Sequence, residues 1–266
     1  MIAKPFVLLC GLLAPIAVAG AQRDFFDRSR GMLGDPNEYY KPPEFRGNTK
    51  YDGRFTFARI KYRGYAHFTN EGPGWAHDYP RAESHFMRIM RELTTMDPFI
   101  ESSAAVGGNI FALDDPELFR YPVAYLSEPG GWFPTDQEVA GLRSYLLKGG
   151  FLIVDDFGGT RDWMNFTAQM QRVLPSARPV ELNGDHPIFD SFFKIDLALL
   201  EHGYRGMPSY FGIFQGNDPT KRIMAIVNFN NDIGDYWEWS DRGFDPLPSN
   251  EAYKLGVNYL IYALTH

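Results

Sequence analysis

Cysteine is nearly absent from the 266-residue chain, whose one cysteine is Cys10. This residue lies in an N-terminal segment that we expect to be removed, so the mature chain offers no disulfide, thiol nucleophile or thiolate metal ligand. Basic residues are also few, because 26 Lys and Arg face 33 Asp and Glu, giving a net charge of −7. Nucleic-acid binding generally needs a basic surface, so we expect no nucleic-acid partner.

Several catalytic signatures are missing as well. The chain has no G-x-S-x-G elbow, no P-loop and no G-x-G-x-x-G after an expected strand. These absences argue against nucleotide hydrolysis and hydride transfer, and no nucleotide or flavin motif is present. The 44% of hydrophobic residues nevertheless suits a folded globular domain rather than a disordered chain.

The first 21 residues form a secretory signal pattern. Lys4 precedes an apolar run over 6–18, and Ala19-Gly20-Ala21 supplies the small residues that a signal peptidase reads. We predict cleavage before Gln22, a periplasmic or secreted protein, and no stable membrane span afterwards; an uncleaved anchor is the alternative. Leu9 is too bulky for a lipoprotein site before Cys10, so we interpret Cys10 as part of the signal.

The remaining chain divides into an arm over 22–54, rich in Pro, Gly and aromatic residues, and a single domain over 55–266. In this domain, segments with strand patterns alternate with segments of helical periodicity. The expected strands are 55–62, 109–113, 122–127, 151–154, 179–182 and 223–229, and the expected helices are 80–96, 135–147, 160–174 and a terminal helix that starts at Ser249. Such alternation predicts an α/β fold with a doubly wound, mostly parallel sheet and helices on both faces. The irregular region 183–248 is expected to hold loops and an added hairpin.

Ligands of such sheets bind beyond the carboxyl ends of the strands. Three loops, 63–79, 127–134 and 155–161, follow expected strands and lie on this rim. The polar and aromatic residues that they carry are His67, Trp75, His77, Asp78, Glu128, Trp132, Asp155 and Asp156.

Asp155 and Asp156 end an apolar strand and are the leading catalytic candidates, as a general base or as ligands of a divalent cation. The structural alternative is that one caps a helix and the other binds backbone N–H groups of the Gly turn. In the catalytic hypothesis Glu128 is a partner acid, His186 a second ligand or proton carrier, and Arg59 an anion clamp. A His186 that only holds its loop is the structural alternative.

The aromatic residues of the rim suggest a binding surface. Trp75 and Trp132 could stack on a sugar ring or a peptide, or could simply cover the end of the sheet. The segment 228–239 (NFNNDIGDYWEW) could bind a polar ligand or Ca²⁺, but it lacks the ordered spacing of a calcium loop, so we interpret it as an exposed aromatic turn.

A series of motifs along the domain resembles a bacterial family of unknown function with a class I glutamine-amidotransferase-like, flavodoxin-like fold. The matching residues are Arg59, Tyr62, Trp75, Asp78-Tyr79-Pro80, Tyr125-Leu126, Gly149-Gly150-Phe151-Leu152, Asp155-Asp156, His186-Pro187-Ile188-Phe189, Tyr210-Phe211-Gly212 and Arg222. The resemblance implies that fold and a setting in the cell envelope. True amidotransferases carry a Cys nucleophile at a strand-to-helix elbow, where this chain has Asp155-Asp156, so we expect no glutaminase activity.

Two functional hypotheses follow. The first is a non-catalytic envelope domain whose rim binds a protein, peptide or glycan, and it leads because no complete catalytic constellation is present. The second is a metal- or carboxylate-dependent hydrolase that acts on envelope glycans or peptides. A divalent cation is the one cofactor that the sequence suggests.

Overall fold

A single seven-stranded sheet organises the part of the chain that the computed structural model describes, residues 47–64, 73–100, 108–200 and 206–266. The strand order is β2-β1-β3-β4-β7-β6-β5, with bounds β1 Ala58–Ile60, β2 Asn109–Phe111, β3 Val123–Ser127, β4 Phe151–Phe157, β5 Val180–Glu181, β6 Ser209–Phe214 and β7 Ile223–Phe229. Strands β2, β1, β3, β4 and β7 are parallel, and β6 and β5 extend the sheet in antiparallel pairing. The predicted α/β fold with a mostly parallel sheet is confirmed.

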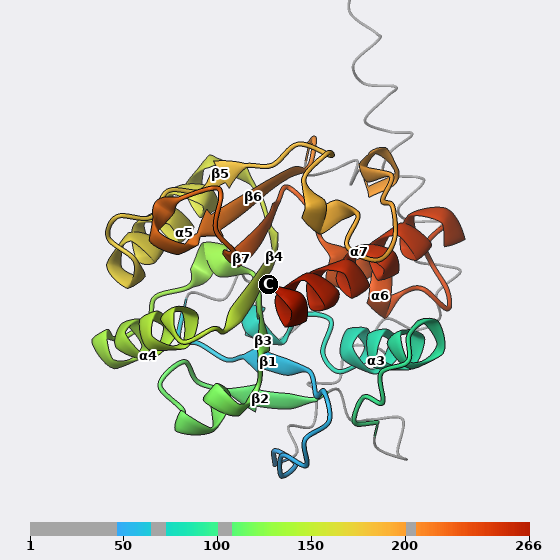
Figure 1. The fold of residues 1–266 in the computed structure, drawn as a ribbon, viewed down its shortest axis with the longest axis horizontal. Helices are drawn as coiled ribbons and strands as arrows, with labels where there is room; N and C mark the ends of the chain where they lie inside the picture. The colour runs from blue at the N-terminus through green and yellow to red at the C-terminus, as the bar shows by residue number, and fades with distance from the viewer. Residues whose placement is uncertain (1–46, 65–72, 101–107, 201–205) are drawn as a thin grey trace, which may run out of the picture. The chain divides into compact units, whose positions relative to one another are not determined.

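Helices cover both faces of the sheet (Figure 1). The α-helices are α3 Arg81–Leu93, α4 Asp136–Leu147, α5 Gly159–Val173, α6 Ile233–Glu238 and α7 Pro246–Thr265. Side chains of α3, α6 and α7 share one hydrophobic cluster, and side chains of α4 and α5 share the other. The sheet is therefore doubly wound, as predicted.

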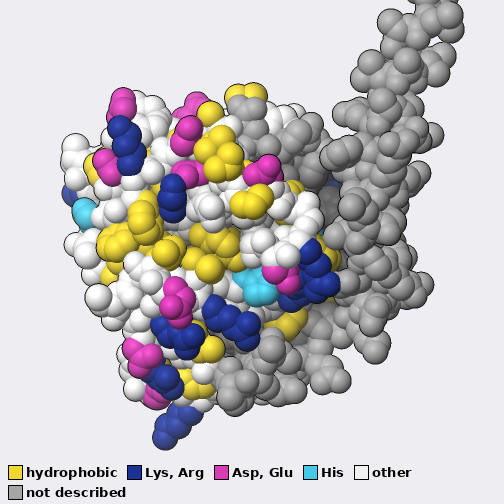
Figure 2. Space-filling view, turned by 90° about the vertical axis from the view of Figure 1, so that its right-hand side faces the viewer, with side chains coloured by type: hydrophobic (Ala, Val, Ile, Leu, Met, Phe, Trp, Pro, Cys, Tyr) yellow, Lys and Arg dark blue, Asp and Glu magenta, His cyan; other side chains and the backbone are white. Residues whose placement is uncertain are grey.

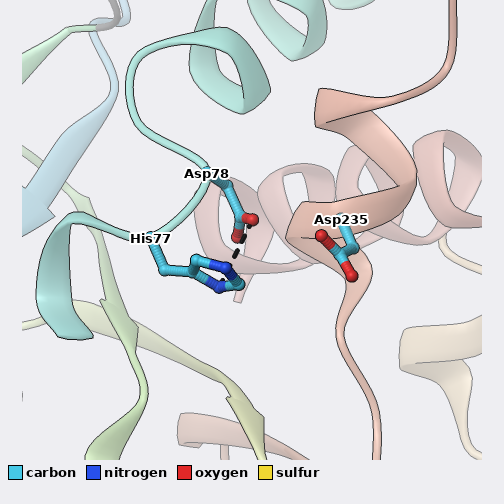
Figure 3. Close-up of side chains that lie close together, drawn as sticks. All are labelled: His77, Asp78 and Asp235. Atoms are coloured by element: carbon cyan, nitrogen blue, oxygen red, sulfur yellow. Dashed lines mark ion pairs between the residues drawn. The ribbon is translucent and has the colours of Figure 1, made fainter. Parts of the chain in front are cut away.

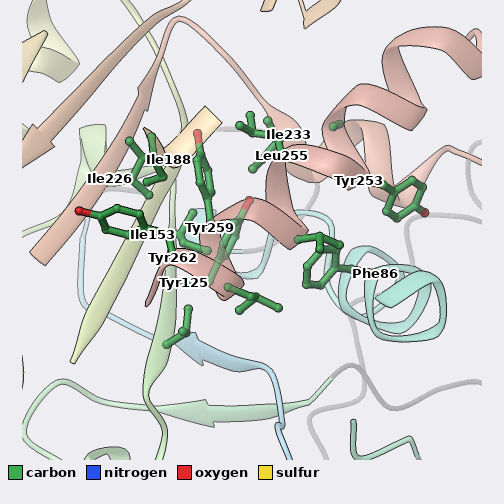
Figure 4. Close-up of a cluster of buried hydrophobic side chains, with 14 of the residues drawn as sticks. Phe86, Tyr125, Ile153, Ile188, Ile226, Ile233, Tyr253, Leu255, Tyr259 and Tyr262 are labelled. Atoms are coloured by element: carbon green, nitrogen blue, oxygen red, sulfur yellow. The ribbon is translucent and has the colours of Figure 1, made fainter. Parts of the chain in front are cut away.

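The alternation of side chains along β3 shows how the sheet separates the two cores. Val123 and Tyr125 belong to the cluster beneath α3, α6 and α7, whereas Ala124 and Leu126 belong to the cluster beneath α4 and α5. Figure 4 shows Tyr125 in the first cluster, with side chains from β4, β7 and α7. A strand buried on both faces needs apolar residues at every position, which explains the continuous apolar runs of this sequence.

The region 183–248 contains the expected hairpin, because β6 pairs antiparallel with β7. It also contains α6, where the sequence suggested an exposed turn; Tyr236 and Trp237 are buried there. Helix α7 begins three residues before the expected start, because Asp245 caps it and Pro246 occupies the first turn. Short 3₁₀ turns complete the connections: Gly74–Ala76, Pro116–Arg120, Pro129–Gly131, Pro187–Phe189, Leu197–Leu200 and Gln215–Asn217.

The described end of the N-terminal arm lies along the edge strand β2. The Asn48 side chain donates to the carbonyl of Ile110 at 2.8 Å and accepts from its N–H at 2.8 Å, as a neighbouring strand would. Thr49 bonds to the Asn109 side chain at 2.9 Å. These contacts cover backbone groups of an otherwise open sheet edge.

The face that carries α3, α6 and α7 mixes acidic, basic and hydrophobic side chains, with Lys and Arg mainly in the lower half of the view (Figure 2). Within the described residues, no helix combines the length and apolar character that a membrane crossing needs.

Candidate functional site

The carboxyl ends of the parallel strands bring four segments together. β1 leads to the turn Gly74–Ala76 and then to His77 and Asp78; β3 leads to Glu128; β4 ends with Asp155, Asp156 and Phe157; and β7 leads to Asp232 and helix α6. β3 and β4 are in register, with Ser127 opposite Asp155. Parallel strands end at the same edge of a sheet, so the topology places these acidic residues around one point.

Both carboxylate oxygens of Asp155 accept hydrogen bonds that hold neighbouring elements of the fold together. Its Oδ2 accepts from the Tyr125 hydroxyl at 2.6 Å and from the N–H groups of Ile233 and Gly234 at 3.0 and 3.1 Å. Its Oδ1 accepts from Asn228 Nδ2 at 2.9 Å. Burial raises the pKa of Asp155 to about 6, against the lowering effect of these hydrogen bonds. Asp155 therefore anchors the start of α6 to the sheet. The sequence had suggested that one of the two aspartates caps the helix that directly follows β4, which is α5.

The Asp156 carboxylate contacts His77. Its Oδ2 lies 2.7 Å from His77 Nδ1 and 3.4 Å from Ser127 Oγ. The backbone of Asp156 is left-handed, with φ 61°, at an irregularity in the pairing of β4 with β7. A carboxylate bonded to one imidazole nitrogen fixes the ring and leaves the other nitrogen for a ligand, an arrangement common behind metal-bound histidines.

Asp78 is the exceptional carboxylate of the site. Its side chain is fully buried, yet neither oxygen has a hydrogen-bond partner within the described residues. His77 Nδ1 is 3.5 Å from Oδ1, too long for a good hydrogen bond. Figure 3 shows Asp78 aimed toward His77 and facing Asp235 of α6. Burial raises the pKa of Asp78 well above its usual range, and nearby carboxylates add to this rise.

Three further acids come from the segment 228–239. Asp232 is buried and caps α6 by accepting from the N–H of Asp235 at 2.9 Å. Asp235 faces His77, and burial together with Asp235 raises the pKa of Glu238 to about 7. From the sequence we did not expect these acids at the site. The available signal was that Asp232 follows β7, the same position that drew attention to Asp155 and Asp156.

Two overlapping sets of residues have ligand atoms within 4.8 Å of one another: His77, Asp78 and Asp235, and His77, Asp156 and Asp232. One imidazole with several carboxylates suits a hard or borderline divalent cation such as Mn²⁺. In the second set, Asp156 already orients His77 and Asp232 already caps a helix. The first set contains Asp78, whose oxygens accept no hydrogen bond from the described chain.

The structure places Arg59 behind the site rather than in it. Arg59 is fully buried in β1 and bonds to Glu83 of α3. Its Nη1 donates to the carbonyls of Trp75 and His77 at 2.9 and 2.8 Å. This geometry suits a residue that positions the loop of His77, and it leaves no exposed guanidinium for the predicted anion clamp.

The candidate residues of the loop that follows β3 do not lie together. Glu128 is at the site, with Oε1 3.9 Å from His77 Nδ1, and its backbone is left-handed with φ 47°. Trp132, expected on the rim, is fully buried in the core beneath α4 and α5. Trp75 is half-buried, two residues before His77.

His186 is not near the cluster. Its ring lies 6.1 Å from that of Phe214, which pairs with Ile223 at the start of β7, whereas the cluster follows the end of β7. His186 accepts from the N–H of Ile188 at 3.2 Å, which is the loop-holding role considered as the alternative. His67 lies outside the described residues.

Comparison with known proteins identifies one family. The model of a family described as a domain of unknown function (DUF4159) matches residues 56–264. No curated protein matches the chain.

Proposed function

The chain belongs to this family of unknown function, and we propose that it is an exported envelope domain that binds a divalent cation in its acidic cluster. Through the cation it binds a partner protein, peptide or glycan. The proposal joins the binding role expected from the sequence to the ligand set at the carboxyl ends of the strands.

The carboxylate of Asp78 is the observation that carries this proposal. An ionised carboxylate that is buried without a hydrogen bond or counter-ion costs several kcal/mol. Both oxygens of Asp78 lack a hydrogen bond within the described chain, the His77 imidazole lies 3.5 Å from one of them, and further carboxylates surround it. A divalent cation in the cluster would supply the missing partner and relieve the repulsion between the carboxylates.

The cation would be held by His77, Asp78 and Asp235, with Asp156 bonded to Nδ1 of the imidazole. Hard divalent cations accept six or more ligands, so three protein ligands leave positions for water or for atoms of a partner. This open coordination is what a cation-dependent binding site requires.

The strand order and the predicted signal peptide support the same proposal. The parallel strands follow the order β2-β1-β3-β4-β7, which agrees with the flavodoxin-like order, whose ligand lies at the carboxyl ends near β1 and β3. We assign the fold to this type and retain the predicted cleavage before Gln22. N-terminal sequencing of protein from fractionated cells tests the export, and a mature protein that begins at Met1 in the cytoplasmic fraction would contradict it.

Metal analysis of protein purified without chelator tests the cation site, together with thermal melts in Mg²⁺, Mn²⁺, Ca²⁺ and Zn²⁺. We expect about one ion per chain, or a rise in Tm of several degrees at a cation concentration far above Kd, because a ligand that binds only the native state stabilises it. Asp78→Asn should abolish this rise. Asp218→Asn is the matched control, because Asp218 lies in the turn that precedes β7, at the opposite end of that strand, and should leave the rise unchanged.

A hydrolase is the second candidate, and the position of Glu128 favours it. Its carboxylate is partly exposed and lies 3.9 Å from His77 Nδ1, beside the proposed cation. It could take a proton from a water molecule in the open coordination positions. Turnover of peptidoglycan fragments that disappears in Glu128→Gln, while the cation remains bound, would establish catalysis; no turnover with the cation bound would leave the binding role alone.

A further inference from the structure

We infer that the cation of the proposed site is a first-row transition-metal ion, which the site selects over Ca²⁺ and Mg²⁺. This inference rests on the proposed function and names the class of cation on which that function depends. It comes from the nitrogen ligand of the cluster and from the elements that hold each ligand in place.

The imidazole of His77 sets the chemical class of the cation. Ca²⁺ and Mg²⁺ take oxygen ligands, whereas imidazole suits transition-metal ions. Both ligand sets contain His77, so a cation in either set gains a nitrogen ligand; Figure 3 shows this ring beside the carboxylates of the first set. The one cysteine of the sequence, Cys10, precedes the domain, so the site offers no thiolate that would favour a soft ion.

The carboxylate that is bonded to His77 strengthens this preference. Asp156 Oδ2 lies 2.7 Å from Nδ1 of the ring. A carboxylate on one ring nitrogen fixes the tautomer and makes the other nitrogen a better ligand, as in the carboxylate–histidine–zinc groups of metalloproteins. A transition-metal ion gains from such a nitrogen, whereas Ca²⁺ and Mg²⁺ gain little from it.

Arg59 fixes the backbone of the loop that carries His77. Its Nη1 donates to the carbonyls of Trp75 and His77 at 2.9 and 2.8 Å, and its guanidinium is buried against Glu83. Ring and backbone of His77 therefore each have an anchor. The imidazole stays at the cluster instead of yielding its place to an oxygen ligand.

The two carboxylates of the first ligand set are held as well. The side chain of Asp78 is fully buried, and a Cβ at Gly234 would lie 2.3 Å from its Oδ2, so it lies directly against α6. Asp235 is in the first turn of α6, whose start is anchored by the N–H groups of Ile233 and Gly234 on Asp155. Ca²⁺ takes six to eight oxygen ligands at roughly 2.3–2.6 Å in a flexible shell. This packing opposes the movement that such a shell needs.

Calorimetric titration of the purified mature protein with Mn²⁺, Ca²⁺ and Mg²⁺ tests the preference. Mn²⁺ binds nitrogen and oxygen ligands most weakly among the common first-row ions, so it gives the strictest comparison. We expect Mn²⁺ to bind at least about tenfold more tightly than Ca²⁺ or Mg²⁺. A smaller difference, or the reverse order, would overturn the inference.

The variant His77→Asp tests whether the imidazole carries the preference. With oxygen ligands alone, the ratio of the Ca²⁺ Kd to the Mn²⁺ Kd should fall to about one. His186→Asp is the matched control, because His186 lies beside Phe214 at the opposite end of the sheet strands and aspartate can still cap its turn. The control should keep the wild-type ratio. An unchanged ratio in His77→Asp would overturn the inference.

Pulsed electron paramagnetic resonance of the wild-type protein loaded with Mn²⁺ gives a test that needs no variant. We expect a hyperfine coupling from a ring nitrogen, which should change when the histidines are labelled with ¹⁵N. Mn²⁺ bound through oxygen alone would overturn the inference while leaving the proposed cation site intact. Failure to bind any cation would refute the proposed function itself, so the two failures can be told apart.

Discussion

Replacing Asp155 by alanine should destabilise the fold rather than merely remove a ligand. The sequence made Asp155, together with Asp156, a leading catalytic candidate, but in the structure its carboxylate connects β3, β4 and β7 to the start of α6. The alanine variant removes the acceptor of four buried hydrogen bonds in a region closed to water.

The expected size of the effect follows from these bonds. A buried donor that loses its acceptor costs about 1–3 kcal/mol. The four donors are the Tyr125 hydroxyl, Asn228 Nδ2 and the N–H groups of Ile233 and Gly234. Allowing for partial relaxation, we expect the free energy of unfolding to fall by about 4–6 kcal/mol, a large share of the 5–15 kcal/mol typical of domains.

Urea unfolding followed by circular dichroism measures this loss. The midpoint should fall sharply, with the slope of free energy against urea unchanged. Asp155→Asn is the control, because its amide oxygen can still accept the bonds made to Oδ2, and it should lose about 1–2 kcal/mol. A loss below about 1 kcal/mol in Asp155→Ala would refute the assignment of this carboxylate as the anchor of α6.

Three further predictions concern two residues next to the site and one, His186, away from it. Arg59→Met should destabilise the protein by about 3–5 kcal/mol by leaving Glu83 buried and unpaired, and the double variant with Glu83→Leu should recover most of this loss in urea unfolding; equal instability of both variants would contradict the pairing argument. Gly234→Ala would place a Cβ 2.3 Å from Asp78 Oδ2, so calorimetric titration should show cation affinity falling at least tenfold; unchanged affinity would exclude Asp78 as a ligand. Burial holds the pKa of His186 below its usual 6.5, so its contribution to stability is present above that value and is lost as pH falls through the lower folded pKa. Tm measured from pH 7.5 to 5 should fall less for His186→Asn, which can still cap its turn, and parallel Tm curves would contradict this assignment.

Much of the fold was predictable because it depends on local pattern. The apolar run of β4 and the capping box of α4, Thr135 with Glu138, appear in the sequence and in the structure. Strand β1 was harder to interpret, because the sequence suggested that Arg59 in this strand is an accessible anion clamp. The strand lies between β2 and β3, so Arg59 is buried and depends on Glu83, 24 residues later. Such a pairing across elements leaves no local pattern.

The site was predictable in position more than in composition. Asp78, Glu128 and Asp156 lie on the expected rim, because the ends of parallel strands must meet there. Asp232 and Asp235 could not be assigned to the site, because the aromatic residues around them in the sequence indicated an exposed turn. Their role depends on Tyr236 and Trp237 packing into the core, and that packing involves helices far away in the sequence.

Anomalous diffraction from crystals grown with Mn²⁺ tests the central claim most directly. We predict one strong peak bounded by His77, Asp78 and Asp235, with Mn²⁺–ligand distances near those of typical N and O ligands, roughly 2.0–2.4 Å. The peak should be absent from crystals of Asp78→Asn. An empty cluster in the wild-type protein at saturating Mn²⁺, or a peak on other residues, would contradict the cation site.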